Sequence, residues 1–286
     1  MGENSNRQVA TGSRQKSLIV PREHGAWGIL LVPLVTGAAA GLLKGGDGWQ
    51  LAPLTIAALA LFWLRTPVES WMGATPVRAR AAAEIRLVRT AALILAAVSV
   101  CALLWLFWGW RNRTVLWIGA AAGIAFAGQA IVKQFRGRNA RTAAQMIGAA
   151  GLTATAPAAF CAVTGKASPD AWFLWAANLL FAINQIHFVQ LRIQTARPKS
   201  RREKFLAGRG FLANQLILIL ILCAVCGLGA FPWFGALAFL PVLWRGFAWF
   251  LTEPRPLAIH ALGKSELLYA CLFGVLLVIG MALGER

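Results

Sequence analysis

The chain has 286 residues, of which 58% are hydrophobic and 13% charged, and its formal net charge is +18. A soluble domain carries about 25% charged residues, so this composition excludes an ordinary soluble protein and places most of the chain in lipid. The basic residues flank apolar segments and form no domain of their own. This distribution argues against nucleic-acid binding and favours the lipid bilayer and its anionic headgroups as partners.

A polar N-terminal segment precedes a series of apolar segments. Residues 1–17 are predicted to form a disordered cytosolic tail, and residues 18–286 a single transmembrane helical domain. Each apolar segment can cross about 30 Å of hydrocarbon, where backbone groups must bond internally and therefore form helices. The predicted spans are 26–43, 50–70, 88–108, 114–132, 142–163, 170–192, 210–229, 231–251 and 265–284. The expected fold is an all-α, polytopic transmembrane bundle of about nine helices.

The distribution of lysine and arginine predicts the orientation of these spans. With the N-terminus in the cytosol, 23 of the 28 basic residues fall inside and five outside. The outer five are Lys44, Arg111, Arg113, Lys166 and Arg286. This asymmetry follows the positive-inside rule and, with nine spans, leaves the C-terminus outside. We expect a location in the bacterial inner (cytoplasmic) membrane and function on the cytosolic face.

Two pairs of glycines have the spacing used for close helix packing. Gly37 and Gly41 form a GxxxG pattern in the first predicted span, and Gly119 and Gly123 repeat it in the fourth. Glycine at this spacing lets two helix backbones approach closely. We therefore expect both spans to pack through these glycines, and the first span to be an uncleaved helix rather than a signal peptide.

The first polar group precedes the first span, in the string PREHGAW at residues 21–27. Arg22 fits the positive-inside rule and Trp27 is typical of an interfacial anchor, so both have a structural explanation. Glu23 and His24 at the start of an apolar helix can cap it, accept protons or bind cations. The string alone leaves the structural and functional interpretations open.

A second polar group ends the second span. Arg65 and Glu69 are four residues apart, so they can pair on one helix face, which is the simpler interpretation. Pro67 between them removes a backbone donor and frees backbone groups. A membrane tolerates this where a polar cavity or a neighbouring helix receives those groups, so Arg65 and Glu69 are also candidates for a site.

The third polar group lies late in the sixth span and contains Asn184, Gln185, His187, Gln190 and Arg192. Asn184, His187 and Gln190 are three residues apart in turn, so we expect them to share a helix face. Isolated polar residues in membrane helices often bond only to neighbouring helices. So many within two turns are more typical of a functional site, because ionisable residues inside a membrane are costly.

Other polar residues have simpler explanations. Gln215, Arg245 and His260 are each expected to serve packing, snorkelling or topology. The chain has two aspartates, Asp47 and Asp170, both on the predicted outer side. A Mg²⁺ site needs several hard oxygen ligands, so no metal site is predicted and no cofactor is assigned.

The string PREHGAWGILLVPLVTG from residue 21 resembles the start of the YwiC-like family of bacterial membrane proteins. The resemblance covers most of the chain, including the QIHFVQLR stretch at residues 185–192. It implies a bacterial membrane protein, and it does not by itself imply a biochemical activity.

A more distant resemblance is to the UbiA superfamily of intramembrane prenyltransferases. It implies a UbiA-like bundle of nine helices, a cytosolic N-terminus, and Asp-rich motifs at the cytosolic ends of helices two and six. In those places this chain has residues 65–71 and 184–192, without the defining aspartates. Their absence argues against Mg²⁺-dependent ionisation of a prenyl diphosphate, a step that relies on metal to neutralise negative charge.

Three functions fit these observations. The first is binding or modification of a lipid-like or isoprenoid-like amphiphile in a cytosol-facing cavity. Its predicted binding residues are Arg22, Glu23, His24, Arg65, Glu69, Asn184, His187, Gln190 and Arg192. His24, His187 and Glu69 are the catalytic candidates, and an enzyme of this kind would be a Mg²⁺-independent or degenerate UbiA-like transferase. The alternatives are a small-solute transporter, and an anchoring or assembly protein that presents the basic loop 193–209.

Overall fold

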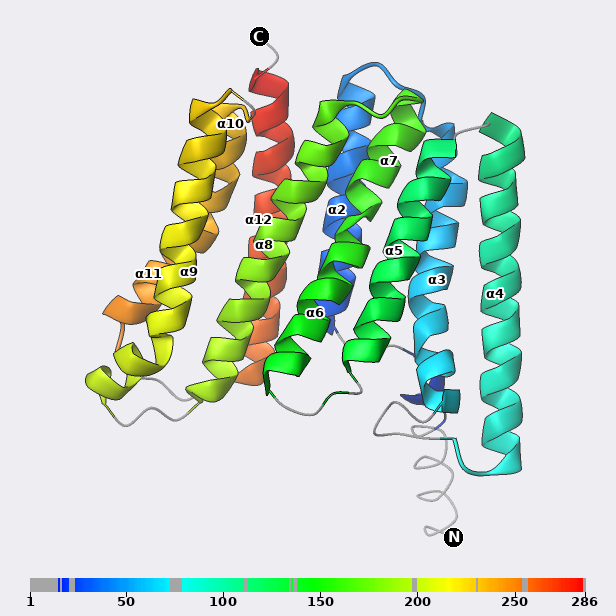
Figure 1. Ribbon diagram of the computed structural model, residues 1–286, viewed down its shortest axis with the longest axis horizontal. Coiled ribbons are helices and arrows are strands. Elements are labelled where there is room, and N and C mark those ends of the chain that lie inside the picture. The colour runs from blue at the N-terminus through cyan, green and yellow to red at the C-terminus, as the bar shows by residue number, and fades with distance from the viewer. Residues whose placement is uncertain are drawn as a thin grey trace, which may run out of the picture. The chain divides into compact units, whose positions relative to one another are not determined.

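The computed structural model describes residues 15, 17–20, 24–72, 79–110, 113–133, 135, 138–196, 200–229, 231–253 and 257–284. Within these ranges the regular structure is helical, and nine segments are long and apolar enough to cross a membrane (Figure 1). The elements are α2 (His24–Leu43), η1 (Gly48–Gln50), α3 (Leu51–Met72), α4 (Ala82–Trp110), α5 (Arg113–Val132), α6 (Arg138–Thr153), α7 (Thr155–Thr164), α8 (Pro169–Gln194), α9 (Arg201–Gly227), α10 (Trp233–Ala236), η2 (Leu237–Phe239), α11 (Leu240–Leu251) and α12 (Ile259–Gly284). The predicted all-α, polytopic fold is confirmed.

Two of the nine spans are interrupted helices. A turn at Ala154 separates α6 from α7, because Pro157 has no N–H for the carbonyl four residues earlier. The hydroxyl of Thr155 donates to the carbonyl of Leu30 at 3.0 Å, which ties the break to α2. The eighth span consists of α10, η2 and α11, and Pro241 at the start of α11 again lacks the donor needed to continue the preceding turn.

The basic loop predicted at 193–209 is too long, because α8 continues to Gln194 and α9 already begins at Arg201 and continues to Gly227. The hydroxyl of Ser200 accepts a hydrogen bond from the backbone N–H of Glu203 at 3.1 Å. Ser-x-x-Glu is the sequence of a capping box, which starts a helix at this point. The positive charges therefore lie mostly on the first turns of a helix, and residues 197–199 lie outside the described residues.

The described helices divide into two compact units. Unit 1 contains residues 1–24 and 49–113, and unit 2 contains residues 25–48 and 114–286. In unit 1, α3 packs against α4, and the indole of Trp63 donates to the carbonyl of Ile19 at 2.8 Å. The guanidinium of Arg89 on α4 lies over the ring of Trp71 at 5.1 Å. The predicted single domain over 18–286 stays a prediction, and the predicted tail falls mainly outside the described residues.

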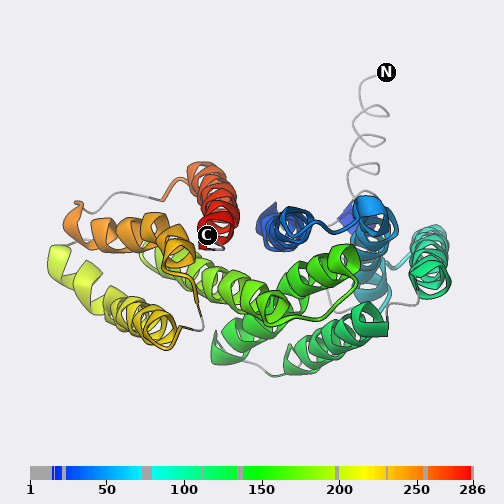
Figure 2. The same cartoon turned by 90° about the horizontal axis from the view of Figure 1, so that it is seen from above.

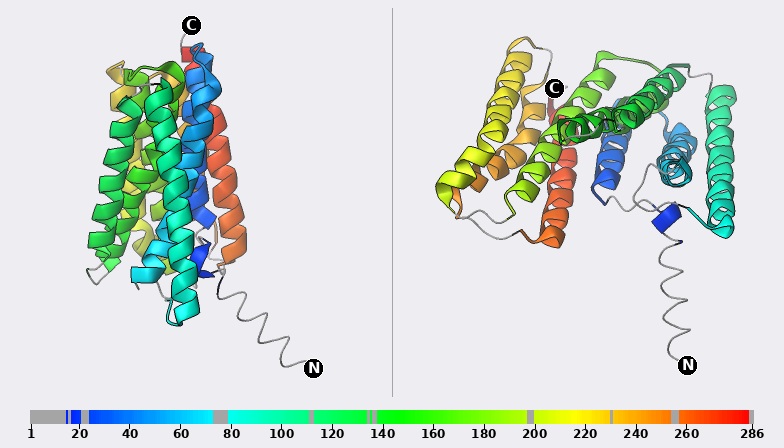
Figure 3. Two further views of the ribbon diagram at one scale, coloured as in Figure 1. Left: turned by 90° about the vertical axis from the view of Figure 1, so that its right-hand side faces the viewer. Right: turned by 60° about the horizontal axis from the view of Figure 1, so that its bottom comes forward.

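In unit 2, α8 runs between α6 on one side and α9 and α11 on the other (Figure 2). Helix α2 lies beside α12 (Figure 3), where Gly274 faces Val32 and Thr36. The amide of Asn178 on α8 donates to the hydroxyl of Thr36 at 3.1 Å. At one end of the unit, α8 and α11 end while α9 and α12 begin. We call this the inner end, because the charge distribution predicts that it faces the cytosol.

The two glycine pairs differ in what surrounds them. A Cβ at Gly37 would lie 2.1 Å from the carbonyl oxygen of Ala156, and one at Gly41 would lie 2.9 Å from Cβ of Val163. Packing of α2 on α7 through glycines is therefore confirmed. The expected packing through Gly119 and Gly123 is wrong for the described residues, because a Cβ at either would meet nothing within 4 Å.

Candidate functional site

An ion pair between Arg245 and Glu266 lies inside unit 2. Arg245 on α11 donates through Nη1 to Oε2 of Glu266 on α12, and the two side chains are only 6% and 7% exposed. Glu266 is seven residues from the start of α12, which corresponds to about 10 Å along a helix. Charges at such a depth are costly in a membrane and are usually paired and functional.

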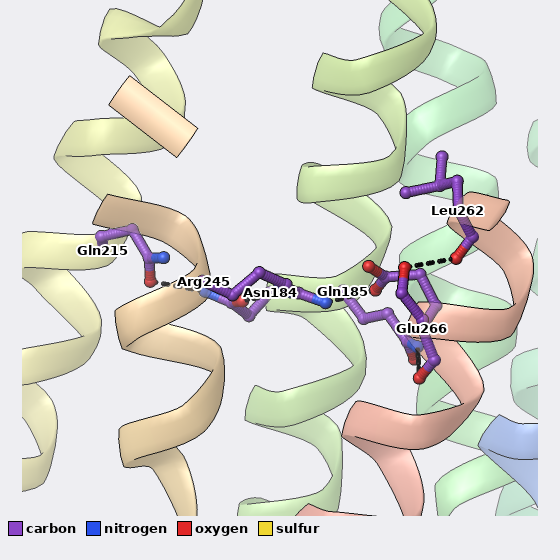
Figure 4. A network of polar contacts seen from close by, with 7 residues as sticks. Asn184, Gln185, Gln215, Arg245, Leu262 and Glu266 are labelled. Carbon is purple, nitrogen blue, oxygen red and sulfur yellow. Dashed lines mark hydrogen bonds and ion pairs between the residues drawn. The ribbon is translucent and has the colours of Figure 1, made fainter. Parts of the chain in front are cut away.

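Amides from two further helices complete the network (Figure 4). Asn184 on α8 accepts from Nη2 of Arg245 at 3.3 Å, and its own Nδ2 donates to Oε1 of Gln215 on α9 at 2.7 Å. Gln185 donates to the backbone carbonyl of Glu266 at 3.0 Å. Adjacent residues of a helix point about 100° apart, so Asn184 and Gln185 contact different neighbours. The network thus connects α8, α9, α11 and α12.

Gly246 leaves the space that the Gln215 side chain occupies. A Cβ at Gly246 would lie 1.6 Å from Nε2 of Gln215, closer than any real contact. Any larger residue here would displace the amide that accepts from Asn184. Two adjacent residues of α11 therefore serve the network: Arg245 supplies the buried charge, and Gly246 leaves the space for the Gln215 side chain.

Aromatic rings enclose the guanidinium of Arg245. Its Cζ atom lies 4.2 Å from the ring centroid of Phe188 and 5.0 Å from that of Tyr269, which is cation–π geometry. Phe188 belongs to a buried hydrophobic cluster with Leu191, Phe211 and Trp249. These contacts hold the arginine independently of its carboxylate partner.

Lysine 204 lies next to the same hydrophobic cluster. Lys204 on α9 is buried, donates to the carbonyl of Thr252 at 2.5 Å and lies 4.6 Å above the ring of Trp249. Gly208, one turn later on α9, lets α9 pack closely against Trp249 of α11, because a Cβ at residue 208 would lie 2.7 Å from the Trp249 ring. The cluster and Lys204 together join α9 to α11 towards the inner end.

Three buried polar atoms of the network have no partner among the described residues. They are Oε1 of Glu266, Nε of Arg245 and Nε2 of Gln215. An unsatisfied buried polar group costs about 1–3 kcal/mol, more when charged. The network is therefore incompletely satisfied, with one acceptor and two donors unused.

The predicted polar group of α8 divides between different neighbours. Asn184 faces α9 and α11, whereas Gln190 donates to Oε1 of Gln145 on α6 at 2.7 Å. His187 is half-buried and makes no side-chain hydrogen bond to another described residue. Arg192 is half-buried and interacts electrostatically with Glu266. By helical geometry Arg192 shares a face with Gln185, which bonds to α12.

The candidates in unit 1 form a local pair. Nε of Arg65 donates to Oε1 of Glu69 at 2.9 Å, so the expected i, i+4 pairing is confirmed. Arg22 and Glu23 lie outside the described residues, as does the side chain of His24. Because Glu69 belongs to unit 1 and His187 to unit 2, their predicted convergence around one pocket stays a prediction.

Sequence reasoning overlooked Glu266 and treated Arg245 as a minor residue. Each is the single charged residue of its predicted span, 265–284 and 231–251. Two lone charges of opposite sign in apolar spans are a signal that they pair, because neither is tolerated alone in hydrocarbon. Asn184 was identified as a candidate, and the structure gives its partners.

Two other features of the described residues are separate from this network. No group of three or more His, Cys, Asp and Glu lies together as a metal site would require. An open apolar groove of about 550 Å³ lies between α9 and α11, and none of the network residues lines it. Its lining residues are Ile219, Leu240, Pro241, Leu243, Trp244 and Phe247.

Residues 20–160 match the family model described as YwiC-like protein. Neither the curated proteins nor the solved structures include a match to this chain. The distant similarity to the UbiA superfamily stays a prediction. The matched residues include Arg65 and Glu69, whereas the network around Arg245 lies beyond them. The resemblance to the YwiC-like family noted from the sequence is therefore confirmed over residues 20–160, and its extension to residues 185–192 stays a prediction.

Proposed function

We propose that this multi-pass membrane protein resides in the bacterial cytoplasmic membrane and binds an amphiphile with an anionic head group at the inner end of unit 2. The supporting observation is the state of Arg192. It is half-buried near the end of α8 and has no hydrogen bond or ion pair with another described residue. A cation that is partly withdrawn from water, and that no carboxylate of the described residues contacts directly, favours an anion as its ligand.

The position of Arg192 favours an amphiphile over a water-soluble anion. Arg192 lies two residues before the end of a helix long and apolar enough to span the membrane. A fully soluble anion would have to leave water to reach a partly buried side chain, which is costly. A lipid-like molecule already holds its head group at this depth and its hydrocarbon in the bilayer.

The test is retention of an acidic amphiphile through purification. Protein purified in an uncharged maltoside detergent is extracted, and bound lipid is quantified by mass spectrometry for wild type and for Arg192→Gln. We expect wild type to retain an acidic amphiphile and Arg192→Gln to lose most of it. Arg209→Gln is the matched control, because Arg209 is an exposed arginine on α9 near the same end. Equal retention by both variants, or no acidic amphiphile in wild type, would contradict the proposal.

Small-solute transport is a second candidate, favoured by the two interrupted spans. Transporters often place broken helices around a buried polar site. Here the breaks at Ala154 and at Leu237–Phe239 are in the same unit as the Arg245–Glu266 pair. Reconstitution in sealed vesicles distinguishes the two functions, because a binding protein retains the amphiphile without moving a soluble solute. The anchoring function is not favoured, because the basic loop on which it depended is largely helical.

A further inference from the structure

The carboxylate of Glu266 lies within electrostatic reach of two arginines. Arg245 donates to its Oε2 atom, and Arg192 lies on the face of α8 from which Gln185 donates to the backbone carbonyl of Glu266, so that its charge acts on the same carboxylate. Two positively charged side chains, Arg192 and Arg245, therefore act on one carboxylate, that of Glu266, and positive charge is in excess there. Arg192 forms no ion pair with a described residue, and Arg245 has one donor, Nε, unused.

Arg245 keeps most of its contacts if the carboxylate leaves. Phe188 and Tyr269 enclose its guanidinium, and Asn184 accepts from Nη2. The unused donors in this network, Nε of Arg245 and Nε2 of Gln215, match a ligand that carries only acceptors. A phosphate group has several acceptor oxygens, and guanidinium groups bind it with charge-assisted hydrogen bonds.

Glu266 is held less completely than Arg245. Its Oε1 atom is buried without a partner among the described residues, and its carboxylate depends on the arginines for counter-charge. A carboxylate that lost both arginines inside a membrane span would be an isolated buried charge. Such a group becomes neutral by binding a proton instead.

We propose that a dianionic, phosphate-like head group replaces Glu266 between Arg192 and Arg245, and that Glu266 takes up one proton as it is displaced. This inference rests on the proposed function and specifies its ligand class. The charges balance, because two arginines face two negative charges of the phosphate and a neutral carboxylic acid. The proton comes from solvent, and no covalent bond other than the O–H bond of Glu266 is formed.

The other charged or titratable side chains near Glu266 among the described residues do not take its place as the carboxylate that is displaced and protonated. Tyr269 and Lys264 are on α12 itself, and Lys264 is exposed. Lys204 on α9 is already bonded to Thr252. From α8, only Arg192 is charged among the described residues that face α12. Helix α2 contributes no titratable side chain within Gly25–Leu43.

The experiment is calorimetric titration of purified full-length protein with dodecyl phosphate in uncharged maltoside micelles. At pH 8 the probe is largely dianionic, since the second pKa of a phosphate ester is about 6. Measurement in two buffers of different ionisation enthalpy counts the protons bound with each probe molecule. We expect wild type to take up about one proton and Glu266→Gln to take up none. Because Glu266→Gln lacks the competing anion, we expect it to bind about tenfold more tightly, a change of about 1.4 kcal/mol.

Glu253→Gln is the control, because Glu253 is 78% exposed in an ion pair with Arg201 near the same end. Its affinity and proton count should equal those of wild type. Binding by wild type without proton uptake, or an unchanged or weaker affinity of Glu266→Gln, overturns the inference and leaves the proposed function standing. If Glu266→Gln does not fold, the proton count of wild type decides. Absence of any binding to wild type counts against the proposed function itself.

Discussion

Two arginine–glutamate pairs of this chain are held in different ways. Arg65 and Glu69 of unit 1 lie four residues apart on one helix, and their side chains are 18% and 22% exposed. Arg245 and Glu266 of unit 2 lie on different helices, 21 residues apart in sequence, and are 6% and 7% exposed. The first pair forms wherever α3 forms, whereas the second requires the assembly of several helices. Burial makes the second pair the one whose disruption should matter.

The largest effect is expected from removing one partner of the buried pair. Arg245→Met leaves Glu266 as an unpaired charge inside the unit, which typically costs about 3–5 kcal/mol. We expect a large loss of thermal stability in detergent and a low yield of folded protein. The double variant Arg245→Met with Glu266→Met removes both charges and should recover most of the stability. A single variant as stable as wild type would contradict this expectation and show that Glu266 is not left as an unpaired charge once Arg245 is removed.

The second effect concerns the space beside the buried pair. Gly246→Ala places a Cβ against Nε2 of Gln215 and should destabilise unit 2 by about 1–3 kcal/mol, the usual cost of overpacking. Combining it with Gln215→Ala removes the clash and should restore part of the loss. Gly119→Ala is the matched control, because open space surrounds that glycine and alanine favours a helix. Thermal unfolding of the four proteins measures these differences, and equal losses at both glycines would contradict the packing described here.

A smaller effect is expected at the start of α9. Ser200→Ala removes the hydroxyl that accepts from the N–H of Glu203 and should cost about 1 kcal/mol. Ser168→Ala is a suitable comparison, because Ser168 precedes α8 without accepting a capping hydrogen bond. Hydrogen exchange of the first turn of α9 measures the change locally. Unaltered exchange in Ser200→Ala would mean that packing, not capping, fixes this helix start.

Hydrophobic length predicted the nine spans well, because the cost of exposing backbone in lipid leaves few alternatives. Their ends were predicted less well, since Ser200 and Glu203 form a local capping signal that hydropathy does not detect. Helix α4 likewise starts six residues before the predicted span, at Ala82.

The pairing of side chains within the candidate site was harder to predict. Asn184 was visible as a polar residue in a span, but its bond to Gln215 depends on which helices become neighbours. Sequence spacing describes one helix at a time, so it identified Arg65–Glu69 and not Arg245–Glu266.

The smallest effect sharpens the comparison of the two ion pairs. A double-mutant cycle with Arg65→Gln and Glu69→Gln isolates their mutual interaction from whatever else each residue contacts. We expect a coupling energy of about 0.3–0.5 kcal/mol, because both charges are partly exposed and adjacent on one helix. The same cycle with Arg245→Gln and Glu266→Gln should give a coupling several times larger, since burial reduces screening. Raising the salt concentration should weaken only the first coupling. Equal couplings at the two sites would show that burial of Arg245 and Glu266 does not strengthen their interaction, and their network would then be ordinary packing.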